Sequence, residues 1–77
     1  MIRDSAHRHG IDDDDIEPAL RNWSTRYSVT DDQGRHLMMY VGPTWSGTLI
    51  EIGLNDNGDV VHAMKARPQF IPTNRRR

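Results

Sequence analysis

A short basic segment in the second half of the chain holds the residue types best suited to chemistry. It reads HAMKAR and contains His62, Lys65 and Arg67. Histidine titrates near neutral pH and can either accept or donate a proton. Arginine and lysine bind phosphate or carboxylate groups, arginine through a planar fork of donors. The segment therefore predicts a site where a proton is moved beside a bound anion.

Strand geometry limits how these three side chains can cooperate. Alternate residues of a strand point to opposite faces, which groups His62 with Val60 and Met64 and puts Lys65 on the other face. His62 and Lys65 would therefore oppose each other unless the strand ends or bulges between them. The alternative interpretation of His62 is a half-buried structural histidine. Lys65 and Arg67 could instead be solvated cations or anchor the tail.

The element before this segment is predicted to be a β-hairpin. Residues 48–54 (TLIEIGL) are the richest in branched apolar side chains and read as a core strand. Residues 55–58 (NDNG) form a turn signal, in which Gly58 supplies the positive φ of a tight hairpin. The hairpin would present the basic segment at its exit.

The N-terminal part of the chain predicts two short helices. Residues 2–9 form the first, with Gly10 as its left-handed stop. The second begins in the aspartate run 12–15, which caps it, and ends near Asn22. Pro18 is tolerated if this helix effectively begins at the end of the run, because Pro18 then falls in the first turn. The apolar stripe consists of Ile16, Ala19 and Leu20.

The remaining elements are strands. Residues 23–30 and 35–42 are rich in β-formers, a turn at 31–34 (DDQG) separates them, and Pro43 ends the second. With the hairpin they give four strands in a meander. This order predicts an α+β fold, with two short helices packed on one face of a four-stranded antiparallel sheet.

The last residues predict an extended C-terminal tail rather than another helix. Pro68 and Pro72 keep it extended, Phe70 and Ile71 could dock it, and residues 72–77 are expected to fray. Residues 1–77 are treated as one small domain.

Composition bounds the class of protein. A chain of 77 residues with 35% hydrophobic content has a small core, so stabilisation by a partner is expected. There is no cysteine for a disulfide, no apolar run of membrane length and no signal-peptide core, which predicts a cytoplasmic protein. Nine of the ten basic residues are arginine, which permits nucleic-acid contact. The net charge of −1 argues against a nonspecific duplex binder.

No metal or cofactor site is expected. His7 and His9 are two residues apart, so on a helix they cannot chelate one ion together. The aspartate run lacks the glycine and the final glutamate of a calcium loop, which leaves helix capping as its role. Trp45, in the loop PTWSG, could stack on a base, fill a partner's pocket or pack over the sheet.

Two motifs resemble small bacterial toxins of the BrnT type, within the RelE/ParE-like group of toxin-antitoxin ribonucleases. Residues 8–11 (RHGI), followed by acids and an amphipathic helix, are similar to the Lys-His-Gly-Val segment of that family. Residues 63–67 (AMKAR) are similar to its late basic motif, without the serine. The N-terminal strand usual in the group is missing from the predicted elements. The resemblance implies a metal-independent endoribonuclease inhibited by an antitoxin.

The resemblance also implies roles for individual residues. RNA cleavage needs a proton carrier, for which His62 is the candidate, and cations at the phosphate, for which Arg67 and Lys65 are candidates. Arg35 and Trp45 would contact RNA. Its partners would be an antitoxin and RNA, and a homo-oligomer is possible. A non-catalytic protein-interaction module with the same fold is the alternative, and a regulatory nucleic-acid binder is a third interpretation.

Overall fold

The computed structural model describes residues 1–67 of the chain. These residues form one α-helix, one 3₁₀-helix and a four-stranded antiparallel sheet, so the α+β class is confirmed. The tail predicted for residues 68–77 lies outside the described residues. In chain order the elements are η1 (Asp4–His7), α1 (Asp13–Arg21), β1 (Thr25–Thr30), β2 (His36–Pro43), β3 (Leu49–Leu54) and β4 (Val60–Lys65).

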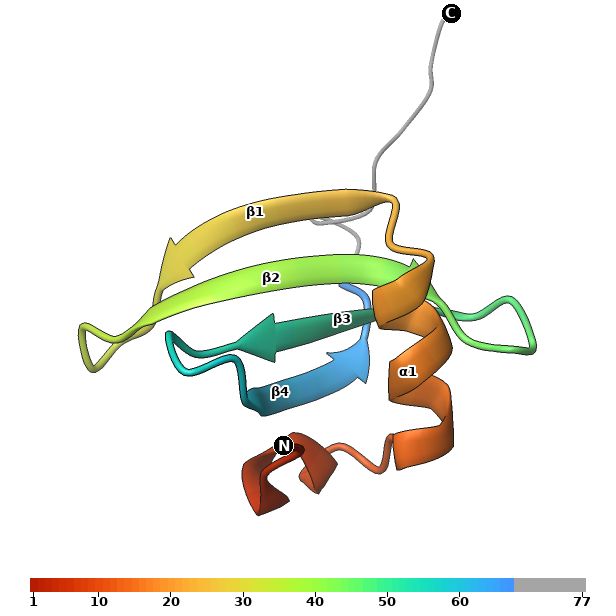
Figure 1. Ribbon diagram of the computed structural model, residues 1–77, viewed down its shortest axis with the longest axis horizontal. Helices are drawn as coiled ribbons and strands as arrows, with labels where there is room; N and C mark the ends of the chain where they lie inside the picture. The colour runs from red at the N-terminus through yellow and green to blue at the C-terminus, as the bar shows by residue number, and fades with distance from the viewer. Residues whose placement is uncertain (68–77) are drawn as a thin grey trace, which may run out of the picture.

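The sheet is the predicted meander. Its strand order is β1-β2-β3-β4 and every neighbouring pair is antiparallel, so consecutive strands lie side by side (Figure 1). Local turn chemistry sets two of the connections. Gly34 and Gly58 have φ angles of 81° and 82°, and each donates its N–H to the carbonyl three residues earlier. Both turns were predicted from the sequence.

One face of the sheet packs against α1 and forms the core. Ile16 and Ala19 of the helix lie with Ile50 and Ile52 of β3 in a fully buried cluster. The helix approaches the sheet closely at Gly42, where a Cβ atom would come 2.1 Å from the carbonyl oxygen of Ala19. Only glycine therefore permits this crossing of α1 over β2.

The first predicted helix is wrong in type and length. Only Asp4–His7 is helical, as a 3₁₀ turn, although Gly10 does adopt the predicted positive φ of 78°. The residues before it are held extended along β4: the Arg3 N–H donates to the carbonyl of Val60, and the Val60 N–H donates to that of Met1. This pairing uses the main-chain groups that a longer helix would need.

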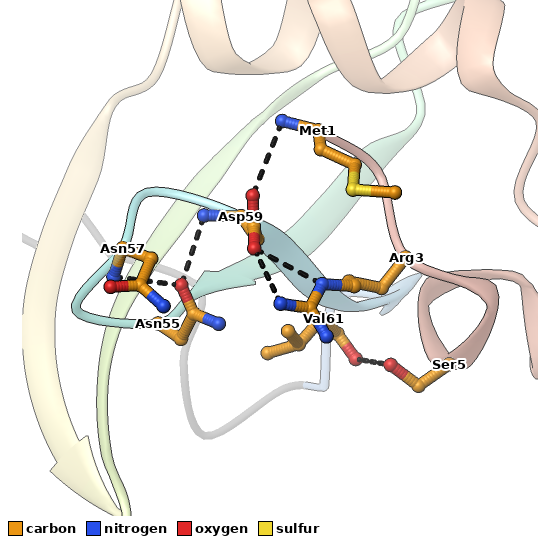
Figure 2. Close-up of polar contacts among 7 residues, drawn as sticks. All are labelled: Met1, Arg3, Ser5, Asn55, Asn57, Asp59 and Val61. Atoms are coloured by element: carbon orange, nitrogen blue, oxygen red, sulfur yellow. Dashed lines mark hydrogen bonds and ion pairs between the residues drawn. The ribbon is translucent and has the colours of Figure 1, made fainter.

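An ion-pair cluster fixes this N-terminal segment to the β3–β4 turn (Figure 2). The Asp59 carboxylate accepts two hydrogen bonds from Arg3, at 2.7 and 3.0 Å, and lies 3.4 Å from the amino group of Met1. Ser5 donates to the carbonyl of Val61 at 2.8 Å. The segment therefore covers part of the outer edge of β4.

The second helix forms as predicted but begins earlier. Asp12 occupies the N-cap position without a side-chain capping bond, and the helix starts at Asp13. Pro18 is therefore the sixth helical residue and lies beyond the first turn. Its missing N–H leaves the carbonyl of Asp14 without an intrahelical partner. Asp14 is exposed, so water can satisfy that carbonyl.

Strand β4 contains a bulge that the alternation rule did not foresee. His62 is opposite Gly53, yet Val60 is opposite Leu54, so Val61 is an extra residue. Val60 consequently joins the core face together with Ala63. The predicted grouping of Val60 with His62 is wrong for this reason.

No helix within residues 1–67 combines the length and apolar character needed to cross a bilayer.

Candidate functional site

The candidate site lies on the face of the sheet opposite α1. Strand register aligns Tyr27, Met39, Gly53 and His62 in one row across all four strands. Met39 and His62 pack closely over Gly53, where an added Cβ would lie 2.9 Å from Met39 Sδ and 3.2 Å from His62 Cβ. The row therefore places Tyr27, Met39 and His62 side by side on one face of the sheet.

Glu51 is the centre of the polar arrangement. Its side chain is 0% exposed, and it accepts hydrogen bonds from His62 and Arg67. His62 Nε2 lies 2.9 Å from Oε2. Arg67 contributes Nη2 at 2.8 Å, Nε at 3.2 Å and its backbone N–H at 3.1 Å. A buried acid in the best core strand is thus fully engaged by the basic segment.

These contacts keep Glu51 ionised. Burial raises the pKa of a carboxyl, but the hydrogen bonds and charge of Arg67, with the hydrogen bond of His62, outweigh burial and hold the pKa of Glu51 below its ordinary value. The same carboxylate raises the pKa of Arg67. The two opposite charges offset one another inside the site.

An ionised Glu51 also determines the tautomer of His62. A carboxylate only accepts hydrogen bonds, so Nε2 must carry a hydrogen and Nδ1 of the neutral ring is left as an acceptor. Nδ1 has no hydrogen-bond partner among residues 1–67. The side chain is 26% exposed. His62 is thus an oriented imidazole that solvent or a ligand can reach.

Tyr27 borders a hollow next to His62. This hollow has a volume of about 380 Å³, and Leu37, Met39 and Arg67 also line it. Burial, with the nearby charge of Glu51, raises the pKa of the Tyr27 hydroxyl, while Arg67 opposes this effect. Tyr27 is therefore a neutral phenol that gives the hollow an aromatic wall.

A second, larger hollow also borders His62. Its volume is about 620 Å³ and it extends to the N-terminal segment. His9 and His62 meet there edge to face, with ring centroids 5.9 Å apart. Its charged lining consists of Arg3, Arg8, Arg35, Asp31 and Asp32.

The charges around this second hollow are partly paired. Arg3 contacts Asp59, and Arg35 contacts Asp31 at 2.8 Å. Among residues 1–67, Arg8 makes no ion pair. An anion entering the hollow would meet Arg8 as the most available arginine.

The structure brings together some of the sequence-predicted residues and separates others. His62 and Arg67 meet at Glu51, and Arg35 shares the second hollow with His62. Lys65 is opposite the buried Ile50, so it lies on the helix-covered face, away from His62. The opposite placement of His62 and Lys65 was predicted.

Trp45 lies apart from both hollows. It is 74% exposed in the β2–β3 connection, so it does not pack over the sheet, which was one of the three alternatives for its role. Its exposure leaves it available for a partner or a base.

Sequence reasoning missed Glu51 and His9 as members of the site. Glu51 interrupts the apolar run of β3, on the face opposite Ile50 and Ile52, and an acid in that position signals a buried cationic partner. His9 carried no local signal, because its contact with His62 spans almost the whole described chain. The partners of Glu51 depend on the strand register, and the partner of His9 depends on the docking of the N-terminal segment on β4.

Within residues 1–67, no group of three or more histidine or acidic side chains is arranged to hold a metal ion. Comparison with known proteins gives no family assignment: no family model matches the chain, and no curated protein or solved structure is significantly similar to it.

Proposed function

We propose that this chain is a metal-independent endoribonuclease that acts on cytoplasmic RNA as the toxin of a type II toxin-antitoxin system. The observation that carries the proposal is the Glu51–His62 contact of 2.9 Å, in which a buried carboxylate orients a reachable imidazole beside an arginine-lined hollow. A carboxylate behind an imidazole fixes its tautomer and stabilises its protonated form.

The reaction begins with proton abstraction. Nδ1 of His62 takes the proton of a ribose 2′-OH, and the 2′-oxygen attacks the adjacent phosphorus. The bond from phosphorus to the 5′-oxygen breaks, which leaves a 2′,3′-cyclic phosphate, and the departing 5′-oxygen takes up a proton to become a 5′-hydroxyl end. Glu51 stabilises the imidazolium that forms, and it does so as a positioning residue without touching RNA.

The cations divide into two roles in this proposal. Arg67 holds and neutralises Glu51, so it positions the site rather than binding the phosphate directly. Arg8 and Arg35 line the larger hollow and would stabilise the phosphate. Tyr27 and Met39 line the smaller hollow and would form a wall for a base.

The toxin assignment draws its support from the two motifs and from the order of elements. The RHGI segment carries Arg8 and His9, and the AMKAR segment ends in Arg67, so both BrnT-like motifs border His62. A helix that precedes an antiparallel sheet is compatible with a RelE/BrnT-like fold. An antitoxin would inhibit by covering the hollows around His62.

The proposal is tested by inducing the chain in a bacterial host and mapping RNA ends by primer extension. Growth arrest with new RNA ends is expected for the original chain. His62→Ala should lower cleavage by about 10²- to 10⁴-fold, the usual contribution of a general base. His36→Ala is the matched control, because His36 pairs with the exposed Asp56 and borders neither hollow.

Each outcome decides between classes of function. Arrest that persists in His62→Ala would show that the proposed site is wrong. Normal growth and intact RNA with a folded original chain would reject the ribonuclease.

That second outcome would favour a non-catalytic interaction module. The specific observation behind this alternative is Trp45, a large apolar side chain that is 74% exposed in the β2–β3 connection. Tryptophan is enriched among the residues that dominate binding interfaces. Salt-sensitive RNA binding without cleavage would instead indicate a nucleic-acid binder.

A further inference from the structure

The N-terminal segment carries a second histidine to the proposed site. His9 lies between η1 and α1, and its ring meets the ring of His62 edge to face at 5.9 Å. His9 is exposed and lines the larger hollow together with His62. Two groups able to exchange protons therefore border one space.

The position of His9 is built by contacts on both sides of it. Arg3 and Met1 are held by Asp59, and Ser5 is bonded to the carbonyl of Val61, next to His62 (Figure 2). After His9, the positive φ of Gly10 turns the chain toward α1. The segment is thus attached to β4 at the level of His62.

Cleavage of RNA by transesterification creates a need for a second proton carrier. The attacking 2′-oxygen and the departing 5′-oxygen lie on opposite sides of phosphorus in an in-line displacement. The group that accepts the first proton is therefore poorly placed to protonate the second oxygen in the same step. A separate acid near the leaving group meets this need.

We infer that His9 is the general acid of the site and protonates the departing 5′-oxygen, while His62 accepts the 2′-OH proton. The inference rests on the proposed ribonuclease function. In the balanced step, one proton moves from the 2′-OH to His62 and one from His9 to the 5′-oxygen, as one P–O bond forms and one breaks. Solvent then removes the proton of His62 and returns one to His9.

Neighbouring charges fit this assignment. Arg8 precedes His9 in the chain, borders the same hollow and makes no ion pair within residues 1–67. It would hold the phosphate close to His9. Arg35, although paired with Asp31, is exposed and lines the same hollow.

The test compares two RNA oligonucleotides of one sequence. One has the natural 5′-oxygen at the mapped cleavage position, and the other has a bridging sulfur there, which leaves as a thiolate without needing a proton. His9→Ala should cleave the natural RNA about 10²- to 10⁴-fold more slowly than the original chain, and the sulfur RNA within about threefold of it. His62→Ala should be slow on both, and His36→Ala should match the original chain on both.

The possible failures are distinguishable. If His9→Ala matches the original chain on natural RNA, His9 is not the acid, but the ribonuclease stands. If His9→Ala is slowed equally on both substrates, His9 serves binding or structure, and the inference is overturned. If the folded original chain cleaves neither RNA, the proposed function and the inference fail together. Circular dichroism and thermal melting of each variant check that the fold is intact.

Discussion

At the scale of single residues, Glu51 joins stability to the proposed chemistry. It is a fully buried acid in the middle of β3, and its negative charge is acceptable only because Arg67 and His62 surround it. The same contacts orient His62 toward the hollows. Loss of the carboxylate would therefore weaken the fold and release the imidazole at once.

We expect Glu51→Gln to lower the free energy of unfolding by about 3 kcal/mol, because it breaks a buried ion pair. The loss stays at the lower end of the range for such pairs, since the Arg67 side chain is 45% exposed and water can solvate it. Urea unfolding at neutral pH measures the effect. Glu17→Gln is the control: it removes an exposed ion pair with Arg21 and should cost less than about 0.5 kcal/mol. Equal losses in the two variants would contradict the role given to Glu51.

At the scale of elements, two glycines set how the layers meet. Gly42 lets α1 approach β2, where an added Cβ would come 2.1 Å from a helix carbonyl oxygen. Gly53 lets Met39 and His62 pack closely over β3, where an added Cβ would meet the thioether of Met39 at 2.9 Å. The first obstacle is main chain and cannot yield, whereas the second is the end of a flexible side chain.

Gly42→Ala should therefore destabilise the fold by about 3 kcal/mol, and Gly53→Ala by only about 1 kcal/mol. In Gly53→Ala the larger effect is expected on RNA cleavage, because the new methyl group crowds the Cβ of His62 at 3.2 Å. Denaturant unfolding of both variants checks the stability order, and RNA cleavage by Gly53→Ala checks the crowding. A Gly42→Ala protein as stable as the original would show that the helix does not pack as described.

At the scale of the whole molecule, charge pairs outside the core give stability a pH dependence. Hydrogen bonds from the backbone and side chain of Arg35 lower the pKa of Asp31, and Arg3 lowers the pKa of Asp59. Together with Glu51, these carboxyl groups stabilise the fold at pH values above their unfolded pKa of about 4. This contribution is lost as the pH falls through the lower pKa values that the groups have in the folded protein. The contribution of His7 to stability depends on pH in the opposite direction, because the hydrogen bond to Asp13 raises the pKa of His7 above 6.5.

The stabilisation by His7 is complete below its unfolded pKa of about 6.5 and is lost as the pH rises through its folded value. We therefore expect maximal stability between about pH 5 and pH 6.5, with a decline on both sides. Urea midpoints measured across this range test the expectation. Asp13→Asn should remove the part of the alkaline decline due to His7 and leave the acid decline unchanged. An alkaline decline of the same size in that variant would exclude the His7–Asp13 pair as its cause.

The sequence by itself determined the elements that depend on neighbouring residues. The turn at Gly58, the alternation along β2 and the helix start in the aspartate run all follow from local conformational preferences and hydrogen bonding. The class of fold and the strand order followed from these elements. His62 and Arg67 were also recognisable, because their side chains suit proton transfer and anion binding.

Only the tertiary structure decided which of these residues meet. The bulge at Val61 placed His62 opposite Gly53, and strand pairing brought Arg67 to Glu51, 16 residues away in the chain. Docking of the N-terminal segment on β4 brought His9 to His62 and kept the first predicted helix to a single 3₁₀ turn. These contacts depend on register and packing between distant segments, for which short-range patterns carry no information.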